Sequence, residues 1–255
     1  MKTFINNQRL AQLAGVHFDS EEIQPGPIVY SRTHLIAAQF PLLSTFPECV
    51  LITSFSDTEC TMAMSRRLPP NVKMWFSNNV SAHHPRIIPV PLGLRTSPES
   101  EVILRAVMDK GRLLQRNLVY MNFWRQIHRP VNPRRGLYEM FKGKEWVTTD
   151  GGFNHIPIDR FYEQIASHPY VLSPSGAGPD CHRHWESILL GSIPIVLKSP
   201  AMKILYGLPC LQVNNWAEVT EERLIAELPE LQKLFQSPLM EICYFEYWKQ
   251  KILEA

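Results

Sequence analysis

The chain has 255 residues, of which 45% are hydrophobic and 20% charged, a globular composition that suffices for one large domain or two small ones. The formal net charge of +2 predicts neither nucleic-acid binding nor membrane binding by bulk electrostatics. No apolar run approaches the roughly 18 residues of a membrane span, and the N-terminus lacks the apolar core of a secretory signal, so we expect a cytoplasmic protein.

Strands and helices alternate in the first half of the sequence. Residues 28–30 and 49–53 are apolar runs that predict strands, and helices are expected over 34–43 and 61–66. Two strand–helix units in succession indicate a parallel sheet. Further strands are expected within 74–80 and over 87–90, with a helix over 102–114.

The second half repeats this alternation after a predicted linker over 110–117. Its last stretch, 241–253, carries apolar residues at helical spacing and predicts an amphipathic helix. The other expected elements are strands over 118–123, 146–149, 170–172, 193–197 and 211–213, and helices over 136–141, 158–168 and 181–190, with another beginning at 218 or 220.

The stretch 170–197 carries the strongest chemical signal, because a glycine-bearing loop leads from a strand into the first turn of a helix. A helix start attracts anions, and the side chains of His182 and Arg183 suit a phosphate. Glu186 lies on the same side of the helix and could accept both hydroxyls of a ribose. These features predict a nucleotide site; the alternative is a core helix with a polar N-terminal cap.

Other side chains are expected to assist the phosphate contacts. The glycine loop supplies two of them, a basic cluster that follows the strand over 118–123 supplies two more, and one lysine ends the strand over 193–197. The basic cluster has an alternative interpretation as a solvated loop. The expected residues are Ser175, Gly176, Arg125, Arg135 and Lys198.

The segment SPSGAGPDCHRHWESILLGSIPIV resembles the donor-nucleotide motif of exostosin-like glycosyltransferases with the GT-B fold, including virus-encoded members. The phrases VLITSFSD, LPPNVKMWF and YMNF are similar to family segments as well. The resemblance implies that His182 and Arg183 face the diphosphate of a nucleotide sugar and that Glu186 holds the ribose. It also implies an α/β chain of two Rossmann-like domains facing across a cleft, with a C-terminal helix crossing back.

The domains expected from this resemblance are an acceptor-binding domain over 1–113 and a donor-binding domain over 114–238. The returning helix would occupy 239–255. Many retaining GT-B enzymes carry a glutamate eight positions before the ribose-binding one, and here that position is Gly178. Its absence indicates an inverting enzyme with a base elsewhere.

Asp57 is the first candidate for this base, because it follows a predicted strand at the edge where open α/β sheets place ligands. The alternative is an N-cap for the helix over 61–66. His84 is the second candidate. Trp75 and Asn78 could bind the acceptor sugar by stacking and by hydrogen bonds, although an aromatic residue at such a place is more often part of a core.

The predicted function is transfer of a sugar from a nucleotide-sugar donor to a hydroxyl of a glycan or glycoconjugate acceptor, with inversion. No metal or other cofactor is expected, since the five cysteines lack metal-ligand spacing, and no nucleic acid is expected as a partner. The alternatives are a catalytically inactive module that binds a nucleotide or glycan, and a nucleotide-sugar epimerase on a similar fold.

Overall fold

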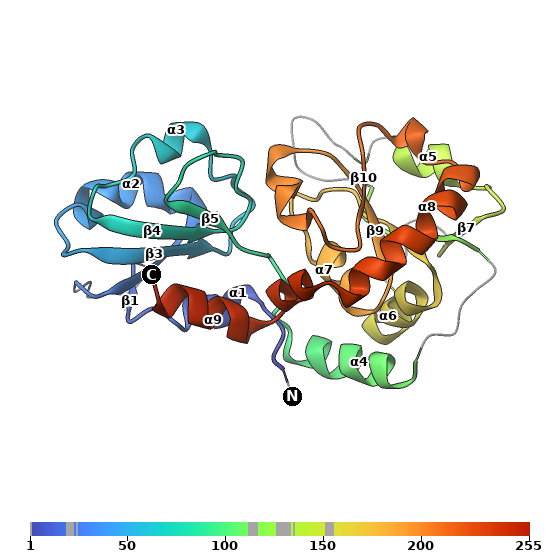
Figure 1. Cartoon of the computed structure of the whole chain (residues 1–255), viewed down its shortest axis with the longest axis horizontal. Coiled ribbons are helices and arrows are strands. Elements are labelled where there is room, and N and C mark those ends of the chain that lie inside the picture. The colour runs from blue at the N-terminus through green and yellow to red at the C-terminus, as the bar shows by residue number, and fades with distance from the viewer. Residues whose placement is uncertain are drawn as a thin grey trace.

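Two α/β domains, each built on a five-stranded parallel sheet, lie side by side in the computed structural model (Figure 1). The structure describes residues 2–18, 23, 25–111, 117–125, 134, 136–150 and 156–255. We call the domain that holds β1–β5 the N-terminal domain and the one that holds β6–β10 the C-terminal domain.

The N-terminal sheet has the strand order β1-β2-β3-β4-β5. Residues Val29, Leu51 and Trp75 are neighbours across three strands and face one side, whereas the next residue of each strand faces the other side. Both faces are therefore apolar, as expected of a parallel sheet covered on both sides. The strands are β1 (Val16–His17), β2 (Ile28–Arg32), β3 (Cys49–Ser54), β4 (Val72–Ser77) and β5 (Ile87–Pro89).

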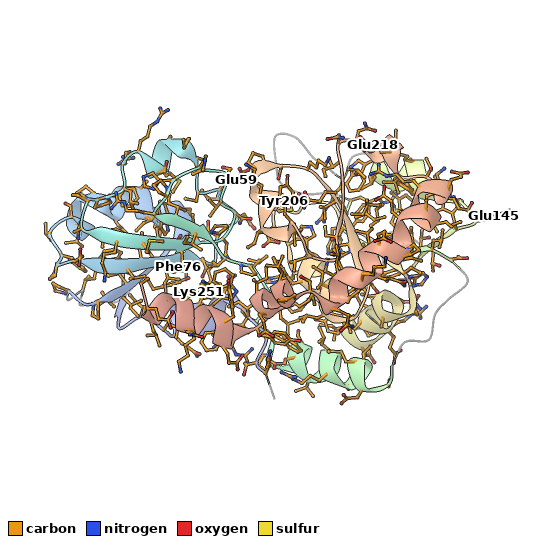
Figure 2. All side chains as sticks on the ribbon, in the orientation of Figure 1. Glu59, Phe76, Glu145, Tyr206, Glu218 and Lys251 are labelled. Carbon is orange, nitrogen blue, oxygen red and sulfur yellow. The ribbon has the colours of Figure 1, made fainter. Side chains whose placement is uncertain are left out.

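Helices from both ends of the chain cover this sheet. Helix α2 (Thr33–Leu43) packs on the face that contains Trp75. The other face is covered by α1 (Asn7–Ala11) and by α9 (Phe245–Leu253), whose Trp248 is buried against it. Figure 1 shows α9, in red, alongside α1 beneath the N-terminal sheet, and Figure 2 labels Lys251 on α9. A short helix, α3 (Met62–Ser65), follows β3.

The C-terminal sheet has the order β10-β9-β8-β6-β7, so the chain reverses its direction of growth between β6 and β8. In open α/β sheets, ligands bind beyond the carboxyl ends of the strands at such a switch point. The carboxyl ends of β6 and β8 are therefore the place at which the fold itself predicts a site. The strands are β6 (Val119–Met121), β7 (Val147–Thr149), β8 (Tyr170–Leu172), β9 (Ile193–Leu197) and β10 (Leu211–Val213).

Two apolar cores enclose the C-terminal sheet. One contains Tyr120, Val171 and Val196 and is closed by α4, α6 and α7, while the other contains Tyr170 and is closed by α5 and α8. The helices are α4 (Pro98–Asp109), α5 (Leu137–Phe141), α6 (Ile158–Ser167), α7 (His182–Leu189) and α8 (Glu221–Lys233), with 3-10 segments η1 (Pro200–Leu205), η2 (Trp216–Glu218), η3 (Leu234–Gln236) and η4 (Pro238–Cys243).

The predicted fold class is confirmed: two Rossmann-like domains and a C-terminal helix that returns to the first form the GT-B architecture. The two-residue strand β1 was not predicted, because so short a run has no periodicity to detect. Helix α4 precedes the expected domain boundary at 113 but packs on the C-terminal domain, because its residues Leu104 and Val107 lie in the core of that domain. Within the described residues, no helix is both long and apolar enough to cross a membrane.

Candidate functional site

Helix α7 begins at the switch point of the C-terminal sheet. It follows the loop that leaves β8, and its N-cap is Cys181. The first turn of a helix has backbone N–H groups without helical partners and carries about half a unit of positive charge. The start of α7 therefore directs positive charge toward the place at which the strand order reverses.

Arg183 lies in the first turn of α7 and is half-buried. Its Nε and Nη1 atoms are buried and have no hydrogen-bond partner among the described residues. The guanidinium lies 6.0 Å from the ring centroid of Phe123, which follows β6. Because buried donors without partners are costly, this arrangement indicates a position for a ligand that accepts hydrogen bonds.

Arg134 adds a second buried guanidinium at the same place. Its Nε donates to the carbonyl of Ser175 at 2.9 Å and its Nη1 to the carbonyl of Trp124 at 2.9 Å, so it joins the loop after β8 to the loop after β6. Burial and the charge of Arg183 lower the pKa of Arg134 to about 10. An anion between the two guanidinium groups would relieve their repulsion.

His184 lies in the first turn of α7, next to two acidic groups. It is fully buried: Nδ1 lies 3.0 Å from Asp180 Oδ1 and 3.3 Å from the amide nitrogen of Cys181, and Nε2 lies 3.1 Å from the carbonyl of Ser173. Burial opposes the charged form, but Cys181 and Asp180 raise the pKa of His184 to about 10. Burial would raise the pKa of Cys181, but His184 and Arg183 lower it to about 7.

Residues 92–95 of the chain cross from the N-terminal domain and bind the start of α7. The amide of Leu92 donates to Asp180 Oδ2 at 2.9 Å, and His182 Nδ1 donates to the carbonyl of Gly93 at 2.8 Å. Gly93 has a φ of +69°, and a Cβ there would lie 2.2 Å from the carbonyl oxygen of Ile5, so only glycine fits. The predicted phosphate contact of His182 must therefore come from Nε2, the ring nitrogen that does not bind Gly93.

Glu186 binds Arg95 across the same junction. Arg95 donates Nε to Oε1 at 2.5 Å and Nη2 to Oε2 at 2.9 Å, and the hydroxyl of Tyr162 donates to Oε1 at 2.9 Å. Burial alone would raise the pKa of Glu186, but the charge and hydrogen bonds of Arg95 hold it below the usual range. The expected ribose contact is not available in this arrangement, because the carboxylate is fully buried and both its oxygens are engaged.

The other expected donor residues differ in their positions. Ser175 and Gly176 lie beside Arg134, whose Nη2 is 3.3 Å from the position of a Cβ at Gly176. Arg125 is directed to α5, where it lies 3.6 Å from the Glu139 carboxylate and 4.3 Å from the centroid of the Tyr138 ring. Lys198 is exposed at the end of β9. Arg135 falls outside the described residues.

Asp57 lies on the opposite side of the domain junction from Arg183. It is exposed, three residues after β3, and its Cα is 3.3 Å from the position of a Cβ at Gly178. Asn79 joins the two loops, since its Nδ2 donates to the carbonyl of Ser56 at 3.0 Å and its Oδ1 accepts from the amide of Asp180 at 2.9 Å. The structure therefore brings the predicted base next to the predicted donor loop.

His84, the second candidate for the base, lies at the amino edge of the N-terminal sheet. The amide of Ile87, the first residue of β5, donates to the carbonyl of His84. Arg86 Nη1 donates to the carbonyl of Val72, the first residue of β4, and to two carbonyls just before that strand. This is the amino edge, whereas Asp57 lies at the carboxyl edge. A histidine that sequence reasoning missed, His34, lies at the carboxyl edge, where its Nδ1 is 3.1 Å from Ser56 Oγ.

Trp75 and Asn78, the expected acceptor residues, are both fully buried. Trp75 packs against Phe40 in the core, and its indole N–H donates to Thr53 Oγ1 at 2.8 Å. It offers no ring face to a sugar, so the core interpretation is the one that matches its burial. The side-chain amide of Asn78 donates to the carbonyls of Val90 and Pro91 and fixes the exit of β5.

No group of three or more His, Cys, Asp or Glu side chains within the described ranges is arranged to hold a metal ion. Sequence reasoning selected Arg125 and Arg135 from the basic cluster and passed over Arg134, whose role depends on contacts with loops that are distant in sequence.

No protein-family model and no curated protein matches the sequence. Among solved structures, HepE from Anabaena in complex with UDP-glucose is 15% identical, with 89% of this chain and 77% of that chain covered and a TM-score of 0.49. An α1,3-fucosyltransferase with GDP is 12% identical (91% and 76% covered, TM-score 0.45). Sucrose-phosphate synthase from Thermosynechococcus elongatus is 13% identical (89% and 72% covered, TM-score 0.48). Likeness at this level concerns the course of the chain, and we infer no activity from it.

The ion pair between Arg95 and Glu186 leads to a prediction about stability. Arg95→Met should lower the free energy of unfolding by about 3 kcal/mol, the lower end of the range for breaking a buried pair, because the Arg95 side chain is 37% exposed. Urea denaturation would measure the loss. Adding Glu186→Gln to Arg95→Met should recover part of it, since no buried carboxylate then remains unpaired.

Arg223 provides the matched control, because it forms ion pairs with Glu218 and Glu227 on the surface of α8. Arg223→Met should cost less than about 1 kcal/mol. An equal loss in the free energy of unfolding for Arg95→Met and Arg223→Met would contradict the prediction that the buried pair between Arg95 and Glu186 stabilises the fold more than a surface ion pair does.

Proposed function

We propose that this protein transfers a sugar from a nucleotide-sugar donor to a hydroxyl of a glycan or glycoconjugate acceptor. The observation that carries the proposal is at the start of α7, at the switch point of the C-terminal sheet, where the buried Nε and Nη1 of Arg183 have no hydrogen-bond partner among the described residues. A diphosphate is the ligand class that suits it, since it supplies several anionic acceptors to a planar donor group and to helix N–H groups.

The charges around this position suit a leaving diphosphate. As the bond between the anomeric carbon and the diphosphate breaks, negative charge develops on the diphosphate. Arg183, Arg134 and the N-terminal end of α7 would stabilise that charge in a partly buried site, where electrostatic stabilisation is strong. These groups supply the positive charge that the step needs, so we propose that the reaction proceeds without a metal.

The position of Gly178 supports a single displacement with inversion. A Cβ there would lie 3.0 Å from Asn79 Nδ2 and 3.3 Å from the Asp57 Cα, so a larger side chain would require the Asn79 side chain and the Asp57 backbone to shift. In the proposed step, the acceptor hydroxyl attacks the anomeric carbon from the face opposite the diphosphate. Asp57 takes the hydroxyl proton, and the diphosphate leaves with the bonding electrons.

One observation favours a second candidate, a nucleotide-binding module without transfer activity. Arg95 and Tyr162 occupy the carboxylate of Glu186, which the family resemblance assigns to the ribose. For transfer, Arg95 would have to release Glu186, or the ribose would be held by other groups. Turnover of a nucleotide sugar, including slow hydrolysis, separates the two candidates.

Arg183→Ala should weaken the binding of UDP or GDP, whichever binds the wild type, about tenfold or more. Loss of a charge-assisted contact to a phosphate costs roughly 1.5–3 kcal/mol, and calorimetric titration would measure it. Arg66→Ala is the control, because it removes an exposed arginine from the N-terminal domain and should leave the affinity unchanged. An unaltered affinity in Arg183→Ala would exclude Arg183 from the donor site.

Asp57→Asn should abolish most transfer while donor affinity stays at the wild-type level. A positioned general base contributes about 10²–10⁴ in rate, and Asn keeps the shape of the side chain without its basicity. Steady-state transfer assays combined with calorimetry would check both parts. A near wild-type rate would move the role to another group, with His34 next to be replaced, and retention of the donor's anomeric configuration would rule out inversion.

A further inference from the structure

Phe55 combines two unfavourable features directly after β3. Its φ is +50°, in the left-handed region that bulky residues rarely adopt. The residue is also 42% exposed, so the fold buries it only in part. A glycine or an asparagine would adopt this backbone conformation at lower cost, so neither local conformational preference nor core packing explains a phenylalanine here.

The surrounding contacts hold the backbone of this turn in place. Ser56 Oγ accepts from the amide of Thr58 at 3.1 Å and lies 3.1 Å from His34 Nδ1, while the carbonyl of Ser56 accepts from Asn79 Nδ2 at 3.0 Å. Strained residues persist where neighbouring structure fixes them, and they cluster at functional sites. The conformation of Phe55 is therefore set by the fold.

The same contacts fix Phe55 close to both halves of the proposed site. It lies two residues before Asp57, and Asn79 ties the turn to the amide of Asp180 in the donor loop. In Figure 2, Glu59, which follows in the same loop, lies on the side of the N-terminal domain that faces the C-terminal domain, and Tyr206 lies on the facing side. The turn that carries the exposed residue Phe55 thus lies next to the donor loop.

We propose that Phe55 is an acceptor-binding residue on which the apolar face of a pyranose ring stacks. This inference rests on the proposed function, and it narrows the acceptor to a molecule whose reacting hydroxyl belongs to a sugar ring. Exposed aromatic rings bind through their apolar faces, and the C–H groups on one side of a pyranose form a matching apolar surface. Stacking beside Asp57 would hold the sugar while one of its hydroxyls meets the carboxylate.

Replacing Phe55 tests the proposal, because function and stability should respond in opposite directions. Phe55→Asn and Phe55→Gly should leave the melting temperature unchanged or raise it by a few degrees, since both residues tolerate a positive φ. The acceptor KM should rise about tenfold with a panel of methyl pyranosides, and the donor dissociation constant should not change. Phe55→Tyr should keep the acceptor KM of the wild type, because tyrosine retains the aromatic ring.

Leu42→Ala is the matched control, because Leu42 has a similar exposed fraction of 44% and lies at the end of α2. It should leave the acceptor KM unchanged. Loss of thermal stability in Phe55→Asn and Phe55→Gly would make Phe55 a structural residue and overturn the proposal. An unchanged acceptor KM in those variants would overturn it as well.

A binding measurement separates this inference from the proposed transfer activity. Saturation-transfer NMR with the same methyl pyranosides should show contact at the C–H protons of one sugar face for the wild type, and that contact should disappear in Phe55→Asn. If this contact is seen but no nucleotide sugar is turned over, the role of Phe55 in sugar binding is supported and the proposed transfer activity is contradicted. If nucleotide sugars are turned over but the pyranoside contacts do not depend on Phe55, only the role of Phe55 is contradicted.

Discussion

The excess of positive charge at the start of α7 is the feature on which the site depends. Two acidic side chains lie close in sequence, but both are engaged elsewhere: Asp180 binds His184, Trp185 and Leu92, and Glu186 binds Arg95. The guanidinium of Arg183 therefore keeps buried donors without a protein partner among the described residues. An anionic ligand would supply the missing acceptors and lower the repulsion between Arg183 and Arg134.

The same residues couple this charge to the arrangement of the two domains. Asp180 contacts the N-terminal domain through Asn79 and through Leu92, and Glu186 contacts it through Arg95. A ligand that changes these contacts would also change how firmly the domains are joined. The proposed donor site and the position of Asp57 are therefore linked by the same contacts.

Much of this arrangement follows from local sequence. Apolar β-branched runs between glycine, proline and polar residues identified the long strands, and the loop before His182 identified the helix that carries the site. Pairings across the sequence were not accessible: Arg95 and Glu186 are 91 positions apart, and Arg134 was indistinguishable from its basic neighbours until its contacts to two loops were known. The acceptor side shows the same limit, since a pattern of aromatics does not reveal that Trp75 is buried while Phe55 is exposed.

Thermal unfolding in the presence of ligands that differ in the number of phosphate groups tests whether a nucleoside diphosphate binds between Arg183 and Arg134. Ligands that bind the folded state raise the melting temperature by an amount that grows with the ratio of ligand concentration to Kd, so UDP and GDP can be compared at equal concentration with UMP, GMP, the free nucleosides and inorganic pyrophosphate. We expect the largest shift for one of the diphosphates, a measurable shift for pyrophosphate and none for the nucleosides. A nucleoside that stabilises the protein as strongly as its diphosphate would contradict this expectation.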